Sequence, residues 1–101
     1  MQVEKRTNET ALEIKFSGNL SFSDHSAFRT PLSDVSRDGV RNCVFDLSGL
    51  TSIDSAGLGM FMIARDEAAK NGWKLTIRSP KGRVKTLFDI ARFDKLLAIE
   101  A

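Results

Sequence analysis

A helical pattern over Asp54 to Lys70 lies between two strand patterns, and it constrains the fold of this 101-residue chain more than any other feature. The strand pattern before it, Arg41 to Leu47, contains the apolar run Cys43-Val44-Phe45, which predicts a strand covered on both faces. The pattern after it, Trp73 to Ile77, alternates apolar and polar residues. Two parallel strands joined through a helix need a crossover connection, so these segments predict an α/β fold.

The ends of this central helix are marked by residues that favour helix termini. Asp54 or Ser55 can cap the free N–H groups at its start, and Asn71-Gly72 can close its end. Before it, Ser48 to Ser55 has the composition of a loop. At helical spacing one broad apolar arc faces the expected sheet, and it consists of Gly57, Leu58, Met60, Phe61, Met62, Ala64, Ala68 and Ala69.

The first part of the chain predicts a hairpin. Ala11 to Phe16 alternates with the period of a half-buried strand, and Gly18-Asn19 then predicts a turn. Val3 to Asn8 is a weaker strand pattern that can pair with it through a turn at Asn8, Glu9 and Thr10.

Helical spacing follows from Ser21 to Asp38, where Phe28, Leu32 and Val35 recur on one face. Pro31 leaves two interpretations open: a helix that starts near Thr30, or an earlier turn with a kink at the proline. Gly39 is the expected end of this helix. Near the carboxyl end, Val84, Leu87, Phe88 and Ala91 predict another helix, and Leu96 to Ile99 a short strand or tail. The order is β-β-α-β-α-β-α-β, which predicts a mixed sheet.

Composition excludes several classes of function. The chain has 15 Lys and Arg against 13 Asp and Glu, and residues of the two signs are interspersed along it. The formal net charge of +2 therefore does not indicate a nucleic-acid binder. One cysteine excludes an internal disulfide, and no apolar run approaches the roughly 20 residues of a membrane span. We expect one compact cytoplasmic domain with one core, a monomer when free.

The junction between the central strand and the central helix is the most informative segment. It places Asp54, Ser55, Ala56, Gly57 and Gly59 where the helix N–H groups and the positive end of the helix dipole favour a negative group. A phosphate on Ser55 would fit there, while the two glycines keep bulk away. Helix capping by the Asp-Ser pair is the simpler interpretation of the same residues.

Three blocks of sequence together resemble the STAS domain of anti-sigma factor antagonists. They are Asp46-Leu47-Ser48-Gly49-Leu50-Thr51-Ser52-Ile53-Asp54-Ser55-Ala56-Gly57-Leu58-Gly59, then Gly72-Trp73-Lys74-Leu75, then Val84-Lys85-Thr86-Leu87-Phe88-Asp89-Ile90-Ala91-Arg92-Phe93-Asp94. The resemblance implies a single STAS domain over residues 1–101, with a mixed sheet of four to five strands and helices packed mainly on one face. It implies no cofactor and no catalysis.

By this resemblance Ser55 matches the serine that a cognate anti-sigma factor serine kinase phosphorylates, and Asp54 the acidic residue before it. The unphosphorylated form would bind the anti-sigma factor and free a sigma factor, phosphorylation would release it, and a PP2C-type phosphatase would reset it. Two departures stand out. Ala56 replaces a second hydroxyl residue, and Ser21 stands where many members have an acidic residue in a loop near the switch site.

Ile63 lies on the polar side of the predicted helix, next to Gly59, and is therefore a candidate partner contact. Single exposed apolar residues are ordinary, which is the plainer interpretation. Substitution of Ile63 by Glu distinguishes contact from burial.

Other candidate chemistry is weaker. His25 has no second His or Cys spaced to make a metal site, and Ser55, His25 and Asp46 lack the loop signatures of a hydrolase. A basic group near the last helix more simply indicates a solvated face, and it comprises Arg78, Lys81, Arg83 and Lys85. Two alternative functions remain, a constitutive adaptor subunit of a lipid-transporting ABC system and a nucleotide-binding STAS module.

Overall fold

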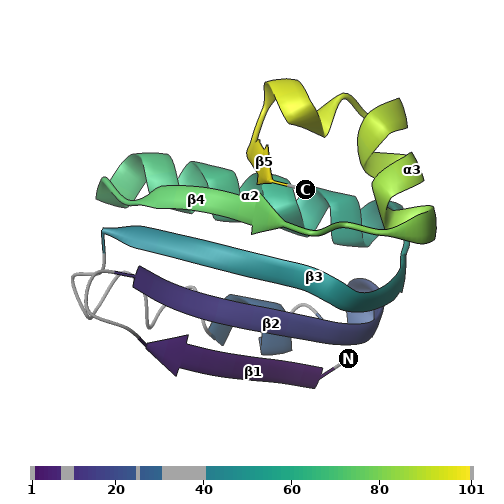
Figure 1. The fold of residues 1–101 in the computed structure, drawn as a ribbon, viewed down its shortest axis with the longest axis horizontal. Helices are drawn as coiled ribbons and strands as arrows, with labels where there is room; N and C mark the ends of the chain where they lie inside the picture. Colours follow the sequence, from purple (N-terminus) through teal and green to yellow (C-terminus); the bar gives the residue numbers. More distant parts are fainter. Residues whose placement is uncertain (1, 8–10, 25, 31–40, 101) are drawn as a thin grey trace.

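Five strands form one mixed sheet, in the order β1-β2-β3-β4-β5 (Figure 1). The computed structural model describes residues 2–7, 11–24, 26–30 and 41–100. The strands are β1 (Gln2–Thr7), β2 (Ala11–Leu20), β3 (Asn42–Ile53), β4 (Lys74–Arg78) and β5 (Ala98–Glu100). β1 pairs with β2 antiparallel, and the three other pairs are parallel. The predicted mixed sheet is confirmed, whereas the turn at 8–10 lies outside the described residues.

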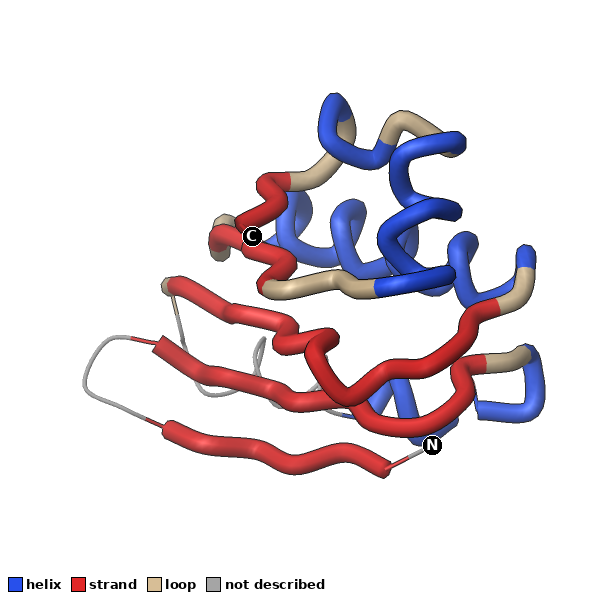
Figure 2. The backbone as a smooth tube through the Cα atoms, turned by 45° about the vertical axis from the view of Figure 1, so that its right-hand side comes forward, coloured by secondary structure: helices blue, strands red, loops and turns tan. Residues whose placement is uncertain are grey.

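The helices lie against one face of this sheet. They are α2 (Ser55–Asn71) and α3 (Gly82–Ile90), with the 3-10 helices η1 (Phe22–Asp24) and η2 (Phe93–Lys95) and helical residues at 26–30. α2 contacts β3 and β4, and α3 contacts β3. Figure 2 shows the helices and the sheet as separate layers. No helix within the described ranges is long and apolar enough to cross a membrane.

Aromatic rings fill the space between sheet and helices. Phe16 of β2 stacks on Phe28 with ring centroids 5.3 Å apart, and Phe28 meets Phe61 of α2 at 5.3 Å. Phe61 then meets Phe88 of α3 at 5.3 Å, and Phe88 meets Phe93 at 4.9 Å. These five rings are buried and belong to separate segments. Edge-to-face and offset pairs of this kind add to the hydrophobic gain of burial, so the rings tie the helices to the sheet.

Two predicted boundaries were wrong, because β2 and β3 both run further than their patterns indicated. Gly18-Asn19, predicted as a turn, lies in β2, and most of the predicted loop from Ser48 to Ser55 lies in β3. The two extensions pair with each other, with register shifts between Lys15 and Ser17 and between Gly18 and Asn19. Irregular pairing of this kind disturbs the alternation from which strands are recognised in sequence.

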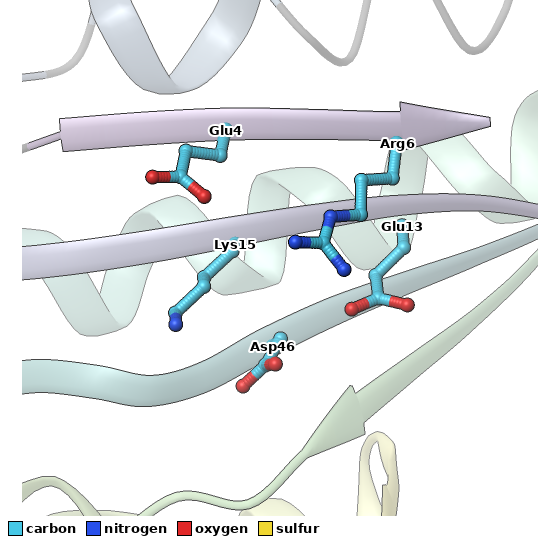
Figure 3. Close-up of a pocket in the computed structure, with 5 residues that line it drawn as sticks. All are labelled: Glu4, Arg6, Glu13, Lys15 and Asp46. Atoms are coloured by element: carbon cyan, nitrogen blue, oxygen red, sulfur yellow. The ribbon is translucent and has the colours of Figure 1, made fainter.

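Coverage of β3 on both faces is also wrong. Cys43, Phe45 and Leu47 are buried, but Val44 and Asp46 between them are only half-buried, because the helices cover one face. The other face is polar, and Figure 3 shows five charged side chains on it, from Glu4, Arg6, Glu13, Lys15 and Asp46.

The helices were predicted more closely. Asp54 is the N-cap of α2, and Gly72 closes it in the left-handed conformation at φ 75°. The apolar arc is confirmed for its five buried members, whereas Leu58 and Met62 are half-buried and Ala69 is exposed.

The segment after β2 is described only in part. Phe28 is buried, as predicted. Thr30 is already helical, and its hydroxyl donates to the carbonyl of Ser26 at 3.0 Å, so helical structure begins before Thr30. Residues 31–40, which include Pro31, Leu32, Val35 and Gly39, lie outside the described residues.

Candidate functional site

The start of α2 is held by Asp54, which follows β3 directly. Its backbone is extended, and Oδ1 accepts a hydrogen bond from the Gly57 N–H at 2.8 Å. Its carbonyl accepts from the Leu58 N–H at 3.1 Å, and its own N–H donates to the Leu20 carbonyl at 3.2 Å. Asp54 therefore caps the helix and joins it to the end of β2.

Ser55 is the first residue of α2, and its side chain is exposed. Within the described part of the chain no hydrogen bond holds its hydroxyl. The first turn of α2 contains no acidic residue, so the positive end of the helix dipole is opposed only by the Asp54 cap. Ser55 is thus an accessible hydroxyl at a position that favours added negative charge.

The two glycines of the junction differ in their surroundings. A Cβ on Gly57 would lie 2.5 Å from Ile53 Cγ1 and 3.1 Å from the Leu20 carbonyl oxygen, so only glycine fits without a shift. A Cβ on Gly59 would meet nothing within 4 Å, and Gly59 is exposed. Gly57 brings α2 close to the ends of β2 and β3, while Gly59 leaves an open surface beside Ser55.

Ser21 lies immediately after β2, in the loop beside this junction. Its N–H donates to Asp24 Oδ2 at 2.9 Å, and its Oγ lies 3.1 Å from the same oxygen and 2.8 Å from Ser23 Oγ. The hydrogen bond from the Ser21 N–H holds the pKa of Asp24 below its ordinary value. The bond from Asp54 to Leu20 places this loop next to the start of α2.

Asp24 is a further candidate residue beside this site that the sequence pattern was not used to identify. The chain lacks an acidic residue at Ser21, yet the structure places a carboxylate in the same loop, three residues later. The available signal was the spacing Ser21-Phe22-Ser23-Asp24, which is typical of a hydroxyl residue and an acidic residue that bond across one turn.

Ile63 lies two turns into α2 and is 45% exposed, so its predicted exposure is confirmed. Ala56, the residue after Ser55, is half-buried. Ser21, Asp54, Ser55 and Gly59 thus stand at the carboxyl ends of β2 and β3 or on the first turns of α2, with Ile63 one turn further on. In sheets with parallel strands this edge is where binding sites are usually found.

The weaker candidates separate from this site. Asp46 lies on the open face of the sheet, where the Ser48 N–H donates to its Oδ1 at 2.9 Å (Figure 3). Burial alone would raise its pKa, but the Ser48 hydrogen bond and the charges of Lys15 and Arg78 lower it. The sheet lies between Asp46, on its open face, and the helix layer that contains Ser55. His25 lies outside the described residues.

The four basic residues near α3 do not form one cluster of free charges, because two of them are in ion pairs. Arg78 pairs with Glu13 at 3.3 Å and with Glu100 at 3.8 Å, and Lys85 pairs with Asp89 at 3.5 Å. Lys81 and Arg83 are exposed at the start of α3. Among the described residues no group of His, Cys, Asp and Glu is placed to hold a metal ion.

Comparison with known proteins shows the family to which this fold belongs. The STAS domain model matches residues 2–101, so the chain belongs to the STAS domain family. A STAS-domain containing protein of Pseudomonas aeruginosa (strain UCBPP-PA14) is 30% identical over 88 residues, which cover 87% of this chain and 86% of that protein. An anti-sigma-B factor antagonist of Staphylococcus aureus (strain NCTC 8325 / PS 47) is 25% identical over 99 residues, 98% of this chain and 92% of that protein.

Solved structures share the fold. The anti-sigma factor antagonist SpoIIAA in its unphosphorylated form superposes with a TM-score of 0.75 at 16% identity, covering 97% of this chain and 86% of that one. The Bacillus cell fate determinant SpoIIAA in its phosphorylated form superposes with a TM-score of 0.74 at 15% identity, covering 99% and 92%.

Proposed function

We propose that this protein is an anti-sigma factor antagonist controlled by phosphorylation of Ser55. The observation that carries the proposal is the exposed, unengaged hydroxyl of Ser55 on the first turn of α2, beside the Asp54 cap. The S. aureus relative is an anti-sigma-B factor antagonist, and SpoIIAA exists in unphosphorylated and phosphorylated forms. Both support a role of this class.

The partner of the unphosphorylated form is an anti-sigma factor that is also a serine kinase. It contacts the edge formed by Ser21, Asp54, Ser55 and the open surface at Gly59, and it reaches Ile63. Asp24 adds a fixed carboxylate to this edge. A PP2C-type phosphatase restores the unmodified serine, and the exchange takes place in the cytoplasm.

Phosphorylation changes binding far more than folding. A phosphate adds about −1.5 to −2 charges, and a helix N-terminus favours a negative group by roughly 0.3 to 1 kcal/mol, up to about 2 when partly buried. The folded chain therefore accepts it. In a complex that removes water from this edge, an unpaired charge costs several kcal/mol, and about 4 kcal/mol is roughly a thousandfold in affinity.

A quantitative pull-down from native lysate with Ser55→Ala and Ser55→Asp baits tests the switch. The anti-sigma factor should be retained by the alanine bait and lost from the aspartate bait. Thr86→Asp is the matched control, because it adds the same charge at an exposed hydroxyl residue within α3. Equal retention of one partner by all baits, or of an ABC ATPase, would show that Ser55 is only a helix residue in a constitutive adaptor.

Incubation of the captured partner with ATP tests the acceptor itself. Mass spectrometry should find phosphate on Ser55 of the natural chain and none on the Ser55→Ala chain. Phosphorylation at any other residue in place of Ser55 would contradict the proposal.

Ile63→Glu tests the reach of the contact surface. Partner binding should weaken at least about tenfold while the melting temperature stays nearly unchanged, because Ile63 is already 45% exposed in the free protein. Ala69→Glu is the control, since Ala69 is also exposed on α2 but on a different side of the helix. If the two variants weakened partner binding equally, Ile63 would not belong to the contact surface for the partner.

A further inference from the structure

Large apolar side chains are exposed at two separate places on the described surface. Ile63 of α2 is one place, at 45% exposure. The other is the segment that runs from the end of α3 to the residue after η2, where Ile90 is 73% exposed and Leu96 is 38% exposed. Ile90 ends α3, and Leu96 directly follows η2. The expectation of a free monomer depended on a small exposed apolar surface, and Ile90 and Leu96 enlarge that surface.

We call the second place the α3 corner, formed by Ile90, Arg92, Lys95 and Leu96. Ile90, Arg92 and Lys95 line one shallow depression together with Asp89. Arg92 has φ 58°, a left-handed conformation that non-glycine residues rarely adopt, and this turn joins α3 to η2. This turn therefore fixes the backbone that carries the apolar and cationic side chains of the corner.

The α3 corner is positively charged. Arg92 and Lys95 are both exposed, and neither forms an ion pair within the described ranges. The acidic lining residue, Asp89, lies 3.5 Å from the ammonium of Lys85, one turn earlier on α3, which offsets its charge. The corner thus suits a surface that combines an apolar side chain with carboxylates that form no ion pair.

A surface of that kind exists on this same chain. We call it the α2 patch, formed by Ile63, Asp66 and Glu67. Residues three and four positions apart lie together on a helix, so both carboxylates flank the exposed isoleucine. Asp66 is exposed, and Glu67 is half-buried with Oε1 3.1 Å from the Asn71 amide nitrogen. Lys70, one turn further along the same face, is the one cation that α2 places beside these two carboxylates, so the α2 patch keeps a net negative charge, opposite to that of the α3 corner, around a matching apolar centre.

We propose that the α3 corner of one copy docks on the α2 patch of a second copy. Ile90 and Leu96 cover Ile63, while Arg92 and Lys95 face Asp66 and Glu67. The complement to the corner in both charge and apolar character is on the chain itself, which is the argument for a second copy as occupant. Two copies that make this contact twice form a closed dimer, whereas copies that make it once each form an open head-to-tail chain.

This contact goes beyond the proposed function. It is measured on the isolated protein without a partner, so a failure of the self-docking proposal is distinguishable from a failure of the proposed function. It also buries Ile63, so self-docking would compete with the partner. We expect it to weaken as NaCl rises from about 0.1 M to about 1 M, where the Debye length falls from about 10 Å to about 3 Å.

Sedimentation velocity over a range of protein concentration is the test. The natural chain should associate reversibly, and Ile90→Ser should reduce the association constant at least about tenfold. A double variant, Arg92→Glu with Lys95→Glu, makes both surfaces acidic, and another, Asp66→Lys with Glu67→Lys, makes both basic. Each should sediment as a monomer alone, and an equimolar mixture of the two should associate again.

The control with the same charge change elsewhere is Arg41→Glu with Lys74→Glu, two exposed residues of which Arg41 directly precedes β3 and Lys74 is the first residue of β4. It should associate like the natural chain, and circular dichroism should show that every variant is folded. A natural chain that stays monomeric at all concentrations in about 0.1 M salt overturns the proposal. So does association that survives both charge reversals, or a mixture that fails to recover it.

Discussion

At the scale of single residues, the candidate site depends on which positions tolerate a side chain. Gly57 is buried between the ends of β2 and β3, and Gly59, half a turn away, is exposed. The two look equivalent in the run Gly57-Leu58-Gly59 but have different physical roles. Gly57 sets the distance between α2 and the sheet, and through it the position of Ser55.

Gly57→Ala should destabilise the protein by about 1 to 3 kcal/mol, because the new Cβ would lie 2.5 Å from Ile53 Cγ1. Gly59→Ala is the matched control and should be neutral or stabilising by about 0.5 to 1 kcal/mol, since alanine favours the helix and finds open space. Urea denaturation of both variants measures the difference. Equal stability of the two would show that α2 shifts to accommodate the methyl group.

Cys43 is buried on β3, and burial raises the pKa of its thiol from the ordinary 9.0 to about 12. Because the folded pKa lies above the unfolded one, the contribution to stability is complete below about pH 9. It falls as the pH rises toward 12, by at most about 1.4 kcal/mol per pH unit. Urea denaturation at several alkaline pH values should show this decline in the natural chain and a smaller one in Cys43→Val.

The thiol should also resist alkylation until the chain unfolds, since the thiolate is the reactive form. Rapid reaction of Cys43 with iodoacetamide in the native protein at pH 8 would contradict both expectations.

At the scale of elements, the extended pairing of β2 with β3 positions the site. Leu20 pairs with Ile53 at the end of the two strands, and Asp54 follows immediately. Side chains hold the irregular stretch together: the Asn19 Oδ1 accepts from the Thr51 hydroxyl at 2.9 Å and from the Ser52 hydroxyl at 2.6 Å. The shifted register therefore leaves few polar groups unpaired, and it carries the strands up to the cap of α2.

Asn19→Ala removes both of these hydrogen bonds and should cost about 0.5 to 1.5 kcal/mol, because the groups involved are close to solvent. The loss should be local. Amide hydrogen exchange should speed up at the ends of β2 and β3 and stay unchanged in β4. Uniform acceleration across the sheet would indicate a global loss of stability in place of a loosened strand end.

At the scale of the whole molecule, the two faces of the sheet differ. The helices and the aromatic rings cover one face, and charged side chains cover the other. The core reaches the edge of the candidate site at Leu20 and Ile53, but the side chain of Ser55 points away from it and is exposed. A charge added at that edge does not enter the core, so the fold and the surface can respond to it separately.

Ser55→Asp should leave the overall stability nearly unchanged, within about 0.5 kcal/mol, or raise it slightly through the helix dipole. Thermal unfolding and urea denaturation measure this, with Ser55→Ala as the comparison. A loss of more than about 2 kcal/mol would show that the hydroxyl is needed for folding, and a binding switch at Ser55 would then be hard to separate from unfolding.

Much of this architecture was predictable from local patterns. The alternation of strand and helix patterns, the Asp54 cap and the Gly72 end depend on periodicity and on backbone conformation within a few residues. The exposure of Ile63 follows from the same periodicity, because its position on α2 places it among polar residues.

Other features were decided only by tertiary structure. The ends of β2 and β3 extend because they pair with each other across some 30 residues of sequence, and the bulges hide that pairing from any local pattern. The place of Asp24 beside Ser21, and the different surroundings of Gly57 and Gly59, depend on segments brought together by the sheet. Sequence therefore determined the elements and their caps, while long-range pairing determined where they end and what surrounds Ser55. Local preferences act over a few residues, but register is set by contacts between distant ones.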